Sequence, residues 1–315
     1  MSDPSMGDPS RSPSSTAVDQ VVVPALRDLG DDFKVRRALP SLRQRTVGPF
    51  VFLDHFGPTQ FGPAKAGERG GIQVRPHPHI GLSTLTYLRQ GQIVHRDSLG
   101  SEQTIEAGDV NWMTAGRGIV HSERSPATAQ ASGGQLFGQQ IWVALPTEHE
   151  ETAPSFSHHP AAALPGGEDD GVKFNVVAGT SLGLRSPVPT YSDLMCVNLV
   201  MRAGARFKLP PEHLERAALL VSGGVQVEGE DGEYDDGRLI VFRPGAEIVL
   251  RATQAAVLLL IGGEPLPERR YLDWNFVSSS RERIEQAKQD WRAGRFDGVA
   301  GDSEFIPLPA DRDTR

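Results

Sequence analysis

The chain of 315 residues contains a single cysteine, Cys196. One cysteine cannot form an internal disulfide, and it cannot supply the several thiolates of a structural zinc site. Because Cys196 lies between Met195 and Val197, we expect a small buried apolar side chain and not a reactive thiol.

The sequence also lacks a basic surplus and long apolar runs. Its formal net charge is -8, which argues against general nucleic-acid binding because phosphates attract basic surfaces. No stretch approaches the roughly 18 uninterrupted apolar residues of a membrane-spanning helix. The opening sequence, MSDPSMGDPSRSPSSTAVDQ, has neither the basic nor the apolar region of a secretory signal. We therefore expect a cytoplasmic protein that contacts neither membrane nor nucleic acid directly.

Glycine and proline, by contrast, are abundant, at 34 and 24 residues. They separate short strand-like runs in the first half of the chain, among them GPFVFLDHF, STLTYL, QIVHRD, DVNWM, GIVHSE and FGQQIWVAL. Short strands with turn residues between them favour a sandwich or a closed barrel. No helical periodicity separates the runs, which excludes a βαβ pattern. The predicted fold class is all-β.

A second series of strand-like runs echoes the first, as a weak internal repeat of domain size. It comprises LMCVNLVMRAG, RAALLVSGGVQVEG, GRLIVFRPG and AEIVLRATQAAVLLLIGG. Between the two series the composition shifts to Pro, Ala, Gly, His and Asp, with one expected strand, VKFNVVAG. We predict a disordered tail over residues 1–17, an N-terminal domain over 18–147, a connection over 148–189, a C-terminal domain over 190–300 and a tail over 301–315.

One helix is predicted near the C-terminus, in SSSRERIEQAKQDWRAGRF. A serine cap precedes helix-forming residues, and Ile284, Ala287 and Trp291 recur at helical spacing. We expect this helix to pack against a barrel; binding to a protein partner is the alternative.

Two short pairs of residues carry the main indication of chemistry. His77 and His79 lie two apart in RPHPHIGLSTLTYL, and His121 and Glu123 lie two apart in AGRGIVHSER. Side chains two apart on a strand share a face, so neighbouring strands could aim three imidazoles and one carboxylate at one point. This donor set suits Fe(II), Mn, Ni, Co or Zn. Either pair alone is more often incidental, but together they favour a metal site.

The segments HPHIGLSTLTYLRQGQIVHRDSLG and GDVNWMTAGRGIVHSE resemble the pirin family of the cupin superfamily. The resemblance runs over roughly Pro49 to Arg124, and the second half resembles the C-terminal cupin of the family more loosely. It implies two cupin barrels (double-stranded β-helices) and one metal ion, usually Fe(II), in the N-terminal barrel alone. The implied ligands are His77, His79, His121 and Glu123. Some pirins cleave the flavonol quercetin with dioxygen, and others are transcriptional co-regulators or modulators of metabolic enzymes.

The sequence departs from the general cupin pattern after the second histidine. Cupins place a ligand glutamate four or five residues later, where this chain has Ser83 and Thr84, and many pirins keep a non-ligand glutamate at the position of Ser83. On a regular strand Ser83 and Tyr87 would share the ligand face and line a substrate pocket. A serine there could not act as a general base, as a carboxylate could. The late position of the second histidine, with Glu123 as fourth ligand, agrees with the pirin pattern.

Further histidines are weaker candidates. His55, in FLDHFGP, and His95, in IVHRDSLG, could contact a substrate or orient a metal-bound imidazole, although a hydrogen-bonded strand histidine is slightly favoured for both. In the second half, His213 and Glu215 form the one pair at ligand spacing, and no later histidine completes a set. We therefore predict no second metal.

Two functions remain open at this stage, and the sequence identifies no catalytic base. The first, modestly favoured, is an Fe(II)-dependent dioxygenase of the quercetin 2,3-dioxygenase type, with dioxygen and a small flavonol-like phenol as substrates. The alternative is a non-catalytic, redox-responsive metal protein that binds a protein partner and regulates transcription or a metabolic enzyme. We expect one divalent metal ion per chain and a monomer.

Overall fold

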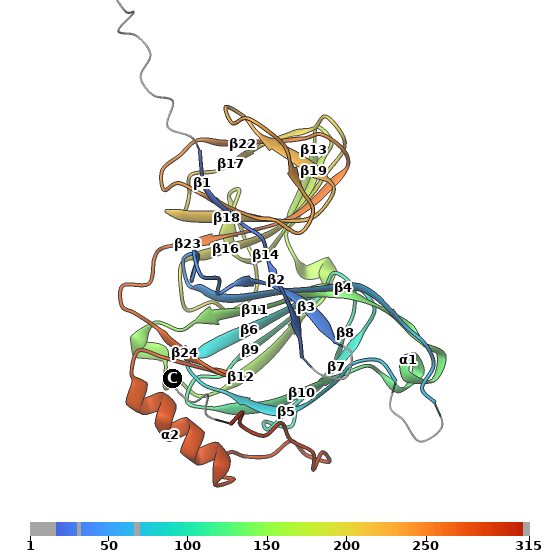
Figure 1. Cartoon of the computed structure of the whole chain (residues 1–315), viewed down its shortest axis with the longest axis vertical. Helices are drawn as coiled ribbons and strands as arrows, with labels where there is room; N and C mark the ends of the chain where they lie inside the picture. Colours follow the sequence, from blue (N-terminus) through green and yellow to red (C-terminus); the bar gives the residue numbers. More distant parts are fainter. Residues whose placement is uncertain (1–16, 30–32, 66–69, 311–315) are drawn as a thin grey trace, which may run out of the picture.

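The computed structural model describes residues 17–29, 33–65 and 70–310. Within these ranges the chain forms two β-barrels, an N-terminal and a C-terminal one, that lie one above the other in Figure 1. Every pair of named strands is antiparallel, so neighbouring strands can be joined by the glycine-containing turns seen in the sequence. The predicted all-β class with two barrels and a short C-terminal helix is confirmed.

The N-terminal barrel consists of a large and a small sheet. The large N-terminal sheet contains, in spatial order, β12 (Ser155–His159), β9 (Val110–Thr114), β6 (Leu82–Gln90), β11 (Gly134–Ala144), β4 (Phe50–Phe61), β3 (Lys34–Leu39) and β2 (Ala25–Asp28). The small N-terminal sheet contains β5 (Gln73–His79), β10 (Ile119–Arg124), β7 (Ile93–Asp97) and β8 (Glu102–Ile105). All six strand-like runs picked out in the first half of the sequence form strands of these two sheets.

The C-terminal barrel repeats this arrangement. Its large sheet contains β1 (Val18–Val22), β21 (Leu239–Phe242), β18 (Glu215–Ser222), β23 (Ala256–Gly263), β16 (Leu194–Met201), β14 (Val172–Ser181) and β13 (Gly166–Asp169), with β15 (Leu184–Arg185) on β14. Its small sheet contains β17 (Arg206–Leu209), β22 (Ile248–Ala252), β19 (Gly224–Val227) and β20 (Tyr234–Asp235). The expected strand VKFNVVAG lies in β14.

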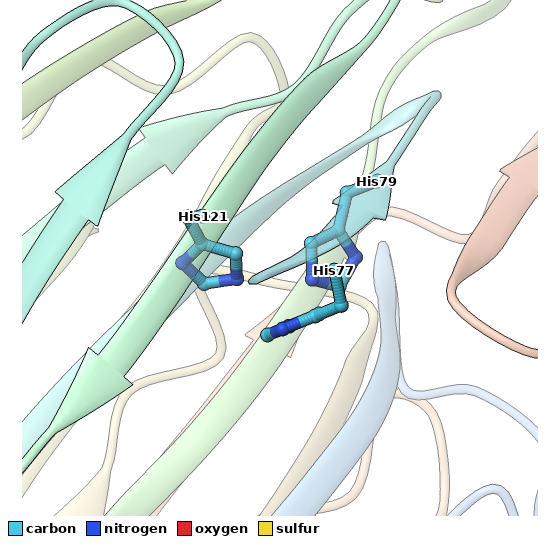
Figure 2. Close-up of side chains that lie close together, drawn as sticks. All are labelled: His77, His79 and His121. Atoms are coloured by element: carbon cyan, nitrogen blue, oxygen red, sulfur yellow. The ribbon is translucent and has the colours of Figure 1, made fainter. Parts of the chain in front are cut away.

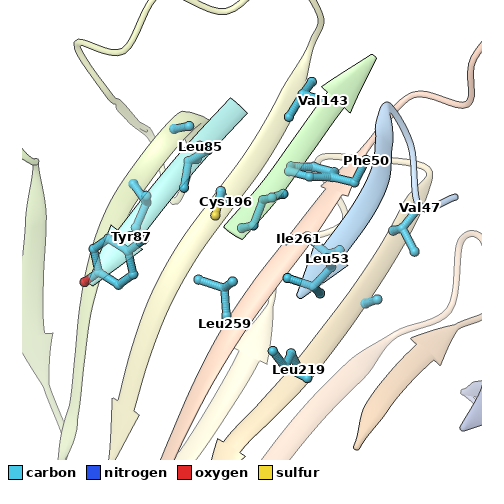
Figure 3. Close-up of a cluster of buried hydrophobic side chains, with 14 of the residues drawn as sticks. Val47, Phe50, Leu53, Leu85, Tyr87, Val143, Cys196, Leu219, Leu259 and Ile261 are labelled. Atoms are coloured by element: carbon cyan, nitrogen blue, oxygen red, sulfur yellow. The ribbon is translucent and has the colours of Figure 1, made fainter. Parts of the chain in front are cut away.

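The two barrels pack through their large sheets. One face of each sheet contributes to a shared hydrophobic core, in which Phe50 and Leu85 of the N-terminal barrel meet Cys196, Leu219 and Leu259 of the C-terminal barrel (Figure 3). Burying each such side chain contributes roughly 1.5–3 kcal/mol. Cys196 is buried, as predicted, and burial raises the pKa of its thiol to about 12.

The two ends of the chain are exchanged between the barrels. β1 pairs with β21 of the C-terminal barrel. At the other end, β24 (Tyr271–Asp273), β25 (Phe276–Ser278) and α2 (Arg281–Arg292) follow the C-terminal barrel in sequence but lie against the N-terminal one (Figure 1). A parallel bridge joins Phe276 to Ile80, the residue after β5.

Segments at both ends of the chain pack across the predicted domain boundaries, which stay a prediction. The N-terminal domain predicted over residues 18–147 begins with a strand of the other barrel, and the C-terminal domain predicted over 190–300 ends with segments that pack on the first barrel. The predicted connection over 148–189 extends both large sheets through β12 and β14. Composition could not reveal these contacts, because an edge strand pairs with whichever sheet edge its chain reaches.

The predicted tails are structured where they are described. Of residues 1–17, only Ala17 lies within the described residues, and it is buried in the C-terminal barrel. Residues 301–310 run along the N-terminal barrel, where Ile306 N–H donates to the carbonyl of Pro76 at 2.8 Å. Residues 311–315 lie outside the described part of the chain.

The C-terminal helix begins and packs as predicted. The Ser280 side chain accepts a hydrogen bond from Arg283 N at 3.2 Å, which caps α2. Ile284 and Ala287 are buried against the N-terminal barrel. The described residues also include a short helix and two 3-10 turns, α1 (Ala127–Ser132), η1 (Thr147–His149) and η2 (Ala161–Ala163). No helix among them has the length and apolar character needed to span a membrane.

We predict that Leu259→Ala lowers the free energy of unfolding by about 2–5 kcal/mol, because Leu259 is fully buried in the core shared by the barrels. Leu42→Ala is the matched control, since the Leu42 side chain is fully exposed, and it should change stability by less than about 0.5 kcal/mol. Equilibrium denaturation of both variants measures the difference. Equal effects would contradict the assigned core.

Candidate metal centre

Three of the four predicted ligands come together on two neighbouring strands. In the small N-terminal sheet, β5 pairs with β10, and His77 lies opposite His121. His79 lies two residues further along β5 and therefore on the same face. Between His121 and Glu123 the register shifts, because Glu123 lies opposite Val74. Pro76, which has no N–H for the ladder, lies in this irregular stretch.

The three imidazoles form a compact buried group. One ring nitrogen from each of His77, His79 and His121 can be chosen so that all three atoms lie within 4.8 Å of one another. The ring centroids are 4.4–5.0 Å apart, and the rings converge from the two strands (Figure 2). The side chains are between 1% and 7% exposed, so this group lies inside the barrel.

Hydrogen bonds leave the Nε2 atoms available to a ligand. His77 Nδ1 lies 2.9 Å from the carbonyl of Arg75, and His79 Nδ1 lies 3.1 Å from the carbonyl of Asn275. Both Nδ1 atoms must therefore carry the proton, which places the lone pair on Nε2. His121 Nε2 is buried and has no hydrogen-bond partner. A buried polar atom without a partner costs free energy, so these residues fit a bound metal ion.

Burial also keeps the histidines in the form that binds metals. Desolvation lowers the pKa of His77 to about 4, with a smaller lowering from His95 and an opposing effect of the hydrogen bond to Arg75. Desolvation and the neighbouring imidazoles lower the pKa values of His79 and His121 well below the ordinary value. At neutral pH the three rings are therefore uncharged, as metal ligation requires.

Glu123 lies in the same cavity but apart from the histidine group. Its carboxylate accepts a hydrogen bond from the Thr86 hydroxyl at 3.1 Å, and it is not one of the residues whose ligand atoms cluster within 4.8 Å. Burial raises the pKa of Glu123, against the opposing effects of His95 and of the Thr86 hydrogen bond. Its role as the fourth ligand stays a prediction.

The histidines open into a cavity of about 940 Å³. One wall is aromatic: the rings of Phe52 and Trp142 stack with centroids 3.9 Å apart, and the edge of Trp142 meets His79 at 5.1 Å. The guanidinium of Arg37 lies 4.3 Å from the centroid of Phe52. An aromatic wall thus lies beside the histidine group, with Phe52 between Trp142 and the guanidinium of Arg37.

Sequence reasoning missed the polar residues of this cavity. Arg37 binds both carboxylate oxygens of Asp54, at 2.8 and 2.7 Å, and both residues line the cavity. Gln140 also lines it and bonds to Thr86. The alternation in FVFLDHF was the available signal, because on one strand Asp54 shares a face with Phe52 and not with His55.

Three predicted pocket residues lie elsewhere, and the expectation that Ser83 and Tyr87 share the ligand face is wrong. Tyr87 is part of the core between the barrels, and the Ser83 hydroxyl bonds to that of Thr114 at 3.0 Å. His55 Nδ1 accepts a hydrogen bond from Gln139 Nε2 at 3.0 Å, and His55 does not line the cavity either. The strand is not continuous here: β5 ends at His79, and Gly81, with a positive φ of 66°, lies between it and β6 of the other sheet, so the alternation of β5 does not extend to Ser83.

His95 is buried on β7, behind the histidine group and outside the cavity lining. Its Nδ1 lies 3.4 Å from Nδ1 of His121. This position does not agree with substrate contact. The contact with His121 agrees with the role of orienting an imidazole, and His95 is also the hydrogen-bonded strand histidine that the sequence slightly favoured.

The C-terminal segment closes one side of the cavity. Ile306 and Leu308 line it. Arg124, the residue after Glu123, binds Asp302 and Glu304 at 2.7 Å each and fastens this segment to β10. The segment predicted as a tail is therefore part of the site.

The C-terminal barrel has apolar residues at the corresponding places. β17 and β22 are the counterparts of β5 and β10 in the sheet order, and Phe207 faces Leu250 where His77 faces His121. Both belong to the hydrophobic core of that barrel. His213 bonds to the carbonyl of Thr180 at 3.0 Å. The absence of a metal from the second barrel stays a prediction.

We predict that the metal-free protein loses stability as the pH falls from about 6.5 toward about 4. The pKa values of His77 and His55 are lowered by burial from 6.5 to about 4, so in this window the unfolded chain binds protons that the folded chain does not. The free energy of unfolding therefore decreases with decreasing pH. Urea titrations across this range test it, and a flat profile would contradict neutral buried imidazoles.

We also predict that His121→Ala abolishes stoichiometric metal binding with little change of fold, because the strands are held by ladders that do not use this side chain. Elemental analysis after loading measures metal per chain, and circular dichroism monitors the fold. His159→Ala is the control, since His159 lies on β12 and bonds to Ser157. Full metal occupancy in His121→Ala would refute the assignment.

Comparison with known proteins agrees with this architecture. Residues 32–143 match the Pirin family and residues 196–297 match the Pirin C-terminal cupin domain. The chain is 49% identical to a pirin-like protein of Caulobacter vibrioides, over 93% of this chain and 99% of the relative. It is 38% identical to a Pseudomonas aeruginosa protein provisionally named quercetin 2,3-dioxygenase PA1205, over 90% of this chain and 88% of the relative.

A solved structure gives the same result for the fold. The crystal structure of quercetin 2,3-dioxygenase from Acinetobacter baumannii matches with a TM-score of 0.84 and 33% identity, covering 94% of this chain and 96% of that one. The two barrels are thus the two cupin domains, and this chain belongs to the pirin family.

Proposed function

We propose that this protein is a mononuclear metal-dependent dioxygenase of the quercetin 2,3-dioxygenase type, acting on flavonol-like phenols. The observation that carries the proposal is the position of the three-histidine group at the wall of a 940 Å³ cavity beside stacked Phe52 and Trp142. The names of the Pseudomonas and Acinetobacter relatives support it.

The metal would be held by His77, His79 and His121, with Glu123 as the fourth ligand. We propose Fe(II), because imidazole and carboxylate donors suit it; Mn, Ni, Co and Zn suit the same set. When bound, the ion would supply Lewis-acid and redox chemistry next to the substrate. The chain supplies the rest of the site.

A planar phenol would lie against the apolar wall that Phe52 and Trp142 form beside the histidines. Glu123 lines the same cavity two residues after His121, and it would take a proton from a substrate hydroxyl only when released from the metal. In the metal-free site, burial raises its pKa. The Thr86 hydroxyl would orient that carboxylate. Ile306 and Leu308 would exclude water from the far side.

The alternative function, a redox-responsive regulator that binds a protein partner, rests on the sequence alone. The cavity beside the histidines favours the enzyme, because a regulator needs a metal-dependent outer surface and not a cavity for a small ligand. A monomeric state and a cytoplasmic location likewise remain proposals from the sequence.

The test is quercetin consumption with dioxygen uptake by protein purified anaerobically and loaded with Fe(II), with the metal content of each sample counted. We expect turnover that follows metal content, vanishes in His121→Ala and persists in His159→Ala. Glu123→Gln should lower kcat by on the order of 10²–10⁴-fold if Glu123 moves the proton. One metal per chain without turnover would contradict the dioxygenase proposal for this substrate class and favour the regulator.

A further inference from the structure

One ligand histidine is oriented differently from the other two. The Nδ1 atoms of His77 and His79 bond to backbone carbonyls, whereas Nδ1 of His121 meets a side chain, the imidazole of His95, at 3.4 Å. A backbone carbonyl can only accept a hydrogen bond. An imidazole nitrogen can accept or donate, so the proton of His121 is fixed only if something fixes that of His95.

Asp97 supplies that constraint. Its Oδ2 lies 3.0 Å from Nε2 of His95, and its carboxylate can only accept, so His95 carries its proton on Nε2. His95 Nδ1 then has the lone pair and accepts from Nδ1–H of His121. This leaves the lone pair of His121 on Nε2, the buried atom without a partner that faces the other ligands. The three groups form one chain of donors directed toward Asp97.

This chain of hydrogen bonds is held in place on β7, the strand next to β10. β7 pairs with β10, and Asp97 lies opposite His121 in the register. The other oxygen of Asp97 accepts the backbone N–H groups of Leu99 and Ser101 at 2.9 and 3.0 Å. The ring of His95 stacks on Phe156 with centroids 4.3 Å apart. Asp97 is 1% and His95 3% exposed, so water does not compete for these bonds.

We propose that His95 and Asp97 are a positioning pair for His121: they fix its tautomer and ring orientation and increase its electron donation to the bound metal. The inference rests on the three-histidine metal site but not on the dioxygenase activity. Loss of the group that hydrogen-bonds to a metal-bound imidazole typically changes metal affinity by 10–100-fold. For His121 that group is His95, and Asp97 acts through it. His121 is thus the ligand through which the protein adjusts its affinity for the metal.

Asp97 also has contacts that would serve the fold alone. Asp97 could merely cap the turn that follows β7, through Leu99 and Ser101. Asp97→Asn separates the two roles, because the amide oxygen can keep both backbone bonds. The amide nitrogen would then face His95 and donate to Nε2, which moves the His95 proton to Nδ1. There it would meet Nδ1–H of His121, and two donors would face each other.

A matched control exists in the same barrel. Asp109 also accepts two backbone N–H groups, from Glu106 at 3.1 Å and Ala161 at 2.8 Å, and it also lies near a histidine, His158, at 3.7 Å. It does not contact a ligand histidine among the described interactions. Asp109→Asn therefore reproduces the change of charge without touching the proposed hydrogen bonds to His121. It disturbs its turn more than Asp97→Asn does, because the two backbone bonds of Asp109 use different oxygens.

The experiment measures the affinity of the full-length metal-free protein for Co(II), by competition with a chelator, together with the visible spectrum of the Co(II) form. We expect Asp97→Asn to bind Co(II) 10–100-fold more weakly with a changed spectrum, and Asp109→Asn to match the wild type in both. If Asp97→Asn does not fold, His95→Phe is the second variant. It keeps a ring stacked on Phe156 and removes the hydrogen bonds between His121 and Asp97. It should show the same loss.

Wild-type affinity and an unchanged spectrum in a folded Asp97→Asn or His95→Phe protein would overturn the proposal. An equal loss in Asp109→Asn would also overturn it, since the effect would then come from charge or turn stability. Absence of Co(II) binding by the wild type would overturn the metal site itself, and the positioning pair with it. Quercetin turnover does not enter this test, so the two proposals fail separately.

Discussion

The antiparallel pairing of β5 with β10 is the constraint on which the site depends. This ladder sets His77 opposite His121, and the pleat brings His79 to the same side. The histidines are then buried together without charge, a condition that is costly unless something satisfies their nitrogens. The surrounding barrel maintains the pairing: β7 holds the other edge of β10, and β25 bridges to Ile80 at the end of β5.

The exchange of chain ends links this site to the rest of the molecule. Asn275, which follows the C-terminal barrel in sequence, orients His79, and Asp302 and Glu304 bind Arg124 beside Glu123. The segment that carries these residues leaves the C-terminal barrel from a sheet that shares a hydrophobic core with the N-terminal one. The small sheet of the C-terminal barrel has apolar residues at the positions of the ligands. The segment that follows this barrel in sequence nevertheless contributes residues to the metal centre.

Much of the fold and of the ligand set could be predicted from local sequence. The runs bounded by glycine predicted the strands, and the serine cap predicted the start of α2. The two-residue spacing of His77 and His79 predicted that both side chains lie on one face of a strand. The sequence did not show which face of the sheet Ser83 and Tyr87 occupy. The strand that carries the histidines ends before Gly81, whose φ is positive, so its alternation does not extend to them. Nor could the sequence give the placement of Asn275 or Ile306, which depends on contacts between residues almost 200 or more positions apart. His95 was singled out, but its partner Asp97 was not, since only the fold shows the chain of hydrogen bonds.

The central claim is that this cluster is a metal centre built by one sheet register. A crystal structure of the Fe(II)-loaded protein, with anomalous diffraction collected at the iron edge, tests it most directly. We expect one anomalous peak per chain, in the N-terminal barrel, at about 2.0–2.1 Å from Nε2 of His77, His79 and His121, the distance typical of imidazole bound to zinc. A peak at any other place, or none at the histidines of a fully loaded protein, would contradict it.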